Sequence, residues 1–274
     1  MSRRLRSPWL ADARHYQIAA LAVLLALNIG LDLGARAAPS LLAVAGALVA
    51  QAACSSLWRL PRLDLRSPLV TGLSLSLLLR ADEPWLMAAA GVIAISAKFI
   101  LRIDGKHVWN PAGFAIVALL AITDRVWISP GQWGASLWFA TLLAFLAIFV
   151  LQRARRGDIA LFFLACHAAL LFLRALWLGD PWAIPLHQLA SGSLLLFAFF
   201  MISDPKTTPD ARLARFLFAL AVALLAHYLA FFLQMRAALY IALIALSPLN
   251  PLFDKFIPAE RFAWTRPARQ GGFR

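Results

Sequence analysis

Two short stretches decide how this chain folds: Leu69-Val70-Thr71-Gly72 and Leu189-Ala190-Ser191-Gly192, each leading into an apolar run. They lie about 120 residues apart and look like two copies of one element. The first run is followed by Glu83-Pro84 and the second by Asp204-Pro205, so that each run ends in an acidic residue and a proline. Repeated, interrupted apolar segments of this kind lie near the midplane site of membrane proteins built from two inverted halves. The two stretches therefore predict such a site.

The composition predicts a membrane protein independently of these stretches. Hydrophobic residues make up 62% of the chain and charged residues 14%, and the mean hydropathy is +0.76. A soluble domain carries about 25% charged residues. We therefore expect an all-α polytopic membrane protein.

Six apolar runs are long enough to cross a bilayer, which takes roughly 20 residues of helix. They are Tyr16–Leu33, Ser40–Trp58, Trp85–Ile103, Gln132–Gln152, Ile159–Leu178 and Ala214–Gln234. Four further runs are shorter or are interrupted by proline, glycine or asparagine: Pro68–Leu79, Pro111–Ile122, Leu186–Ile202 and Ala237–Leu246. Runs of this length are typical of broken or half-membrane helices.

About ten segments divide into two groups of five. Because five is an odd number of crossings, the second group would enter the membrane from the opposite face, which predicts two inverted five-helix repeats. The expected organisation is a cytoplasmic N-terminal segment at residues 1–15, a first repeat at 16–123, a second repeat at 124–254 and a basic cytoplasmic tail at 255–274.

The net charge of +13 indicates how the chain is oriented in the membrane. Loops that carry an excess of lysine and arginine stay in the cytoplasm. The basic clusters fall at alternate ends of the predicted segments, and the opposite loops hold little beyond Arg36, Arg80, Arg125 and Arg236. We expect a multi-pass protein of the inner (plasma) membrane with both termini in the cytoplasm. Its partner is then the lipid bilayer, and nucleic acid is not expected.

Several polar residues lie within or beside the apolar segments, where a polar group is costly and tends to face a cavity. The candidates for cofactor binding or pore lining are Thr71, Gly72, Lys98, Asn110, Pro111, Ser191, Gly192, Asp204 and Pro205. Each has a structural alternative. The small residues allow close helix packing, Lys98 can extend its amine to the interface, and Asp204 can hold a turn before Pro205.

Self-contained catalytic motifs are absent from the sequence. It has no phosphate-binding Gly-rich loop, no Gly-x-Ser-x-Gly and no cysteine cluster. Its intramembrane histidines have no carboxylate at a fixed helical offset, so no metal site and no catalytic residue is predicted. Any redox chemistry would need a borrowed cofactor, and whether the chain is an enzyme stays open.

The residues also resemble a known family. Thr71-Gly72-Leu73-Ser74-Leu75-Ser76-Leu77, then Lys98, then Asn110-Pro111-Ala112 are similar to the first half of the D subunit of Rnf complexes and of the B subunit of the sodium-pumping NADH:quinone oxidoreductase. The stretch from Ser191 to Pro209, with Phe200-Met201-Ile202-Ser203-Asp204-Pro205, resembles the second-half signature. Leu246 to Asp254 resembles the last helix and its exit. The resemblance runs in order from Leu69 to Asp254.

This resemblance implies a urea-transporter-like fold of two inverted five-helix repeats, and a flavin-carrying subunit that passes electrons across the membrane within a larger complex, with ion movement coupled to it. Family members attach FMN to the last threonine of a Ser-Gly-Ala-Thr type motif, and no such tetrapeptide occurs here. The implied cofactor is then FMN or riboflavin held without a covalent bond. The chain resembles short, stand-alone members of the family.

Two other functions stay open on the same fold. One is a channel or transporter for a small solute, with its site between Gly72 and Gly192. The other is a membrane accessory to a biosynthetic pathway. The implied partners are other redox-complex subunits or further copies of this chain.

Overall fold

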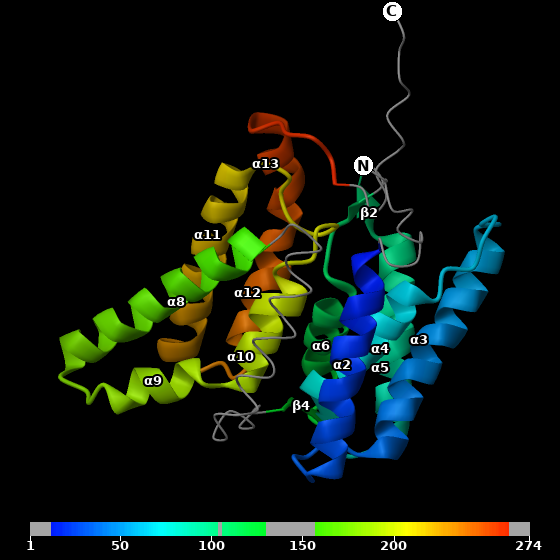
Figure 1. Cartoon of the computed structure of the whole chain (residues 1–274), viewed down its shortest axis with the longest axis horizontal. Coiled ribbons are helices and arrows are strands. Elements are labelled where there is room, and N and C mark those ends of the chain that lie inside the picture. Colours follow the sequence, from blue (N-terminus) through cyan, green and yellow to red (C-terminus); the bar gives the residue numbers. More distant parts are fainter. Residues whose placement is uncertain (1–11, 104–105, 130–156, 263–274) are drawn as a thin grey trace, which may run out of the picture.

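The computed structural model describes residues 12–103, 106–129 and 157–262, and these are mostly helical (Figure 1). A first helix group contains α2 (Ala13–Gly30), α3 (Ala37–Leu57), α4 (Arg66–Leu78), α5 (Pro84–Ile100) and α6 (Pro111–Ile122). A second helix group contains α8 (Gly157–Leu178), α9 (Ala183–Leu189), α10 (Gly192–Leu196), the π-helical turn η2 (Phe197–Met201), α11 (Arg212–Phe231), α12 (Ala238–Leu246), the 3₁₀ turn η3 (Ser247–Leu249) and α13 (Asn250–Phe256).

Two small antiparallel ladders join parts of the first group. Strand β1 (Leu79–Ala81), which follows α4 directly, pairs with β4 (Val126–Ile128), which follows α6. Strand β2 (Arg102–Ile103) pairs with β3 (Lys106–His107) between α5 and α6. The first ladder gives hydrogen-bond partners to the backbone just beyond two short helices.

Local sequence explains where several helices begin. Asp12 caps α2, because its side chain accepts a hydrogen bond from the Arg14 backbone NH. Asn110 caps α6 by accepting from the Gly113 NH at 3.0 Å, and Pro111 follows at the first helical position. Pro84 occupies the same position in α5.

The helices confirm a helical membrane protein. In the described residues, α3, α8 and α11 are long and apolar enough to cross a bilayer, and α9 with α10 and η2 forms a fourth candidate that is bent by 48°. This bend lies at Ala190-Ser191, within the run that the sequence predicts to be interrupted. Helices also occupy the other predicted runs, except that Gln132–Gln152 lies outside the described residues. One of the ten predicted segments is therefore not placed. Two of the expected full crossings end earlier than predicted. Helix α2 ends at Gly30 and α5 at Ile100, and neither is among the helices long and apolar enough to cross.

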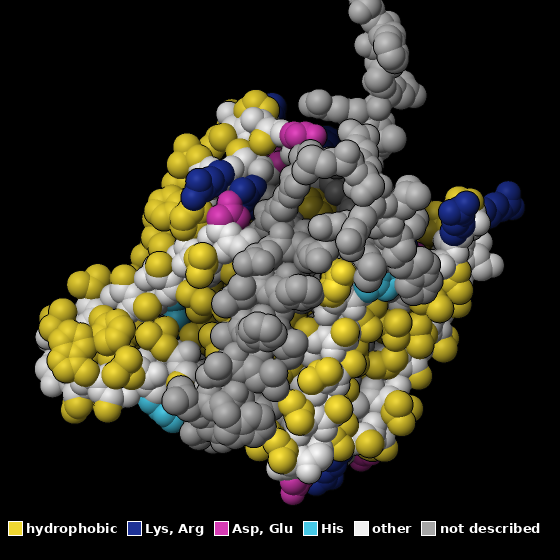
Figure 2. All heavy atoms as spheres, viewed as in Figure 1, with side chains coloured by type: hydrophobic (Ala, Val, Ile, Leu, Met, Phe, Trp, Pro, Cys, Tyr) yellow, Lys and Arg dark blue, Asp and Glu magenta, His cyan; other side chains and the backbone are white. Residues whose placement is uncertain are grey.

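The two groups lie side by side, with α6 of the first group packed against α12 of the second (Figure 1). Within the first group α3 packs against α5 and α5 against α6, whereas within the second α8 packs against α11 and α11 against α12. Hydrophobic side chains cover much of the flank seen in Figure 2, and charged side chains gather toward the two ends of the helices. Such a surface suits a bilayer.

Helices α3 and α5 approach so closely that their contact tolerates only small residues. Ala43, Ala47, Ala90 and Ala94 are completely buried there. A methyl group added to Gly91 would overlap the carbonyl oxygen of Ala43 and lie 2.6 Å from the backbone nitrogen of Ala47. Because these obstacles are backbone atoms, no side-chain rotation can relieve them. Small residues that let backbones meet are a common device of membrane helices.

We expect Gly91→Ala to destabilise the protein by roughly 1–3 kcal/mol, because one methyl group must push two helices apart. The measurement is the melting temperature of the purified variant in detergent. Gly30→Ala is the matched control, since nothing lies within 4 Å of a Cβ at Gly30. An equal melting temperature for Gly91→Ala and wild type would contradict the close packing of α3 on α5.

Candidate functional site

A cavity of about 280 Å³ lies where the two helix groups meet. Its walls come from the starts of α2, α4 and α6, from α5 and β3, and from the end of η2 with the loop that follows. The polar side chains that line it are Arg14, Gln17, Asp64, Ser67, Thr71, Ser74, Lys98, His107, Asn110, Ser203, Asp204 and Lys206. Phe199 and Phe200 add aromatic surface. The cavity is thus built by both groups.

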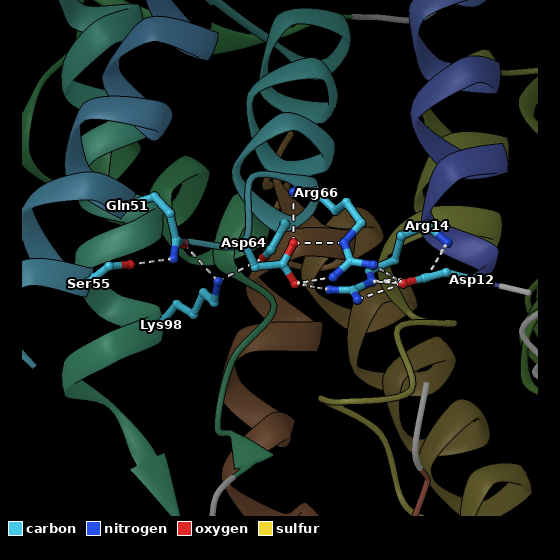
Figure 3. Close-up of polar contacts among 8 residues, drawn as sticks. Asp12, Arg14, Gln51, Ser55, Asp64, Arg66 and Lys98 are labelled. Atoms are coloured by element: carbon cyan, nitrogen blue, oxygen red, sulfur yellow. Dashed lines mark hydrogen bonds and ion pairs between the residues drawn. The ribbon is translucent and has the colours of Figure 1, made fainter. Parts of the chain in front are cut away.

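Lys98 is the buried cation of this cavity. Only 8% of the residue is exposed, so its amine does not extend to the surface. Its Nζ donates to Gln51 Oε1 at 3.0 Å and to Ser67 Oγ at 2.9 Å, and Gln51 in turn donates to Ser55 Oγ at 3.1 Å (Figure 3). Both acceptors of Lys98 are neutral, and no ion pair joins Lys98 to a carboxylate of the described residues. The cavity therefore holds a positive charge that a ligand can balance.

Four charged residues form an ionic network (Figure 3), and two of them, Arg14 and Asp64, line the cavity. Arg14 contacts Asp12 and Asp64, each at 2.7 Å, and Arg66 contacts Asp12 at 2.7 Å and Asp64 at 2.8 Å. Burial raises the pKa of Asp64, but hydrogen bonds from Arg66 and the charge of Arg14 outweigh it and lower the pKa well below its usual range. The network fastens the start of α2 to the loop before α4.

His107 gives the cavity a neutral imidazole. Burial, together with the positive charges of Lys98 and Arg102, lowers the pKa of His107 to about 3. Its Nδ1 is buried without a hydrogen-bond partner. At neutral pH the ring can therefore both donate and accept a hydrogen bond, as a neutral histidine does.

Asp204 holds a turn and also reaches across the cavity. Its Oδ1 accepts from the Lys206 backbone NH at 3.0 Å, and its carbonyl oxygen accepts from the Thr208 hydroxyl at 2.9 Å. Its Oδ2 accepts from Asn110 Nδ2 at 3.4 Å, a long contact between the two helix groups. Both interpretations of Asp204, as a turn residue and as a cavity residue, agree with this geometry.

The structure brings six of the nine sequence candidates together around this cavity: Thr71, Lys98, Asn110, Pro111, Asp204 and Pro205. The other three lie elsewhere. Gly72 packs against α3, since a Cβ there would lie 2.7 Å from Val44 Cα. Ser191 and Gly192 are at the start of α10, where the hydroxyls of Ser191 and Ser193 are 2.9 Å apart. None of the three lines the cavity.

Several polar residues of the site are not among the sequence candidates, and these include Gln51, Asp64, Ser67 and His107. Ser67 and Asp64 precede a predicted apolar run, and Gln51 is the one amide within Ser40–Trp58. The presence of Gln51 in an otherwise apolar helix was a usable signal, because a buried amide needs a partner. His107 follows Lys106 in a short strand and had no distinguishing pattern.

A triad of one lysine and two aspartates joins the two helix groups beside this cavity. Lys106 Nζ lies 2.5 Å from Asp210 Oδ2 and 2.7 Å from Asp254 Oδ2. Asp254 Oδ1 accepts from the Asp210 backbone NH at 2.7 Å. Lys106 follows α5, whereas Asp210 precedes α11 and Asp254 lies in α13. This triad therefore ties the two groups together.

The network predicts how stability depends on pH. Because folding lowers the pKa of Asp64, its contribution is complete above its ordinary value of about 4 and is lost as the pH falls toward the lowered one. We expect Asp64→Asn to lower the melting temperature at pH 7 and to melt closer to wild type as the pH falls from about 5 to 3. Asp82→Asn, at an exposed carboxylate, is the control. A constant difference between Asp64→Asn and wild type at every pH would contradict this role.

Comparison with known proteins gives two findings. The chain is 28% identical to a protein from Stutzerimonas stutzeri that is named as the D subunit of an ion-translocating oxidoreductase complex, over 78% of this chain and 81% of that protein. The model of the NQR2, RnfD, RnfE family matches residues 120–263, which is more than half of the chain. Both findings agree with the resemblance carried by the sequence stretches above. This membrane protein belongs to the NQR2, RnfD, RnfE family.

Proposed function

We propose that this chain is an inner-membrane subunit of an ion-translocating oxidoreductase complex, and that the cavity at Lys98 holds a flavin without a covalent bond. One observation carries the proposal: a buried ammonium group lies in a cavity built by both helix groups and has only neutral partners, Gln51 and Ser67. A relative's name gives the class of complex. The role in electron transfer is part of this proposal.

The residues present fit a flavin. An isoalloxazine ring is flat and aromatic and carries carbonyl and imino groups along one edge; Phe199 and Phe200 supply apolar surface, and Lys98, Asn110 and His107 supply polar groups. The unpartnered Nδ1 of His107 is a buried polar atom at the same cavity. A bound flavin would supply the redox chemistry. Lys98 would favour its negatively charged, reduced form by placing a positive charge beside it.

We also propose the inverted repeat, with halves at residues 16–123 and 124–254. The supporting observation is that the start of α4, at Ser67 and Thr71, lines the same cavity as the end of η2 and Asp204. Likewise Trp109, just before α6, donates to the Ile244 carbonyl near the end of α12 at 2.8 Å. In each pair the start of one helix meets the end of the other, as expected of inverted copies.

The same geometry supports the proposed orientation. The cavity end collects Arg14, Lys98, Lys206 and the Lys106 triad, whereas Arg125 pairs with Glu83 beside the β1–β4 ladder. A basic end marks the cytoplasmic side, so we assign the cavity and both termini to that side. Electron transfer requires donors and acceptors, which we assign to other subunits of the complex; association of further copies of this chain is the alternative.

The test is a visible absorption spectrum of the protein purified in mild detergent, followed by acid precipitation. We expect a flavin spectrum, with the flavin released to the supernatant. Lys98→Met should weaken flavin binding at least about tenfold, because a hydrogen bond to a charged group contributes about 1.5–3 kcal/mol. Methionine keeps most of the side chain's volume and leaves no unpaired charge buried at the cavity.

Arg62→Met is the matched control. It removes a positive charge at an exposed residue that does not line the cavity. Flavin that stays in the pellet would contradict the non-covalent attachment. A protein that remains colourless after flavin supplementation would contradict the flavin role and favour a solute channel or transporter on the same fold.

A further inference from the structure

A second cavity, of about 360 Å³, lies next to the first. The two share His107 and Lys206. The walls of the second cavity come from β2 and β3, from the loop at residues 206–210, from η3 and α13, and from residues 259 and 261. We refer to it as the α13 cavity. Nothing in the proposed flavin role requires it.

The α13 cavity is positively charged. Four cationic side chains line it, Lys106, Lys206, Lys255 and Arg261, against two carboxylates, Asp210 and Asp254. Both carboxylates contact Lys106. Among the described residues, no ion pair engages Lys206, Lys255 or Arg261. These three cations therefore remain available to an anionic ligand.

Beside these cations, the segment around α13 exposes an apolar row. Leu249, Leu252 and Phe256 are 40%, 50% and 76% exposed and follow one another at spacings of three and four residues, which places them on one helical face. Lys255 and Asp254 in the same helix line the cavity. A short helix with an apolar row next to cations is typical of a segment that lies in the membrane interface.

Together these observations select one ligand. A soluble phosphate compound would need the cations but not the exposed leucines and phenylalanine, whereas an anionic phospholipid needs both. Basic pockets at the cytoplasmic side of membrane helices suit anionic lipid head groups. We propose that the α13 cavity binds the head group of an anionic glycerophospholipid: Lys206, Lys255 and Arg261 contact the phosphate, and the acyl chains lie along Leu252 and Phe256.

The experiment uses the full chain in neutral detergent, titrated with dihexanoyl-phosphatidylglycerol and followed by native mass spectrometry. We expect saturable binding of one lipid, with much weaker binding of dihexanoyl-phosphatidylcholine. The double variant Lys255→Gln/Arg261→Gln should bind phosphatidylglycerol about 30-fold more weakly, since each basic residue near such a surface contributes about fivefold. Phe256→Gln should also weaken lipid binding.

The control is Arg59→Gln/Arg62→Gln, which removes the same charge from two exposed arginines outside the α13 cavity and should bind as wild type does. Equal weakening in both double variants would show a general charge effect and overturn the proposal. So would equal binding of phosphatidylcholine. If glycerol 1-phosphate binds as tightly as phosphatidylglycerol, the site recognises a soluble phosphate compound and the lipid proposal fails. None of these readouts depends on bound flavin.

Discussion

Polar groups that lie among apolar helices must find their partners within the protein, and the whole arrangement depends on this constraint. Helices α4, α6 and α12 are too short to cross a bilayer, which takes about 20 residues. Side chains satisfy the backbone where these helices begin or end: Asn110 caps its own helix α6, and Trp109 donates to a carbonyl of α12. Asn250 Nδ2 likewise donates to the Thr207 carbonyl at 2.6 Å. The bond from Trp109 joins the two groups, and both cavities are lined by residues of the two groups.

Charged side chains also need partners within the protein, and their partners differ with how deeply they are buried. Arg14 and Arg66 find carboxylates in the network at the edge of the cavity, and Lys106 finds two beyond it. Lys98 is deeper and has only an amide and a hydroxyl as acceptors. Taking a cation out of water with neutral partners alone costs stability. A negatively charged ligand at the cavity would offset this cost, and this is why the proposed function is centred there.

The positions of the helices could be predicted because apolar runs and their boundaries are local properties of a sequence. The interruption near Ser191 could be predicted from small and polar residues within an apolar run, whereas the cap at Asn110 is seen only in the structure. Which residues meet at the cavity could be predicted only in part from the sequence. Asp64 and Arg14 form an ion pair although they are 50 residues apart, and Lys98 donates to Gln51, which lies 47 positions earlier in the chain. No local sequence pattern indicates that residues so far apart in the chain lie in contact. Gly72 shows the other limit, since a glycine has no side chain whose chemistry indicates which neighbour it faces; here it faces α3.

The contact of α3 with α5 also determines where this molecule is able to deform. Their backbones interlock through Gly46 and Gly91, where a Cβ would overlap a carbonyl oxygen of the opposite helix. Helices α3 and α5 are therefore expected to move together as one rigid unit. Between the two groups, ion pairs such as Lys106 with Asp254 and the long Asn110–Asp204 contact add to the apolar packing of α6 on α12. Polar contacts of this kind can exchange partners with water, which the interlocked backbones of α3 and α5 cannot do.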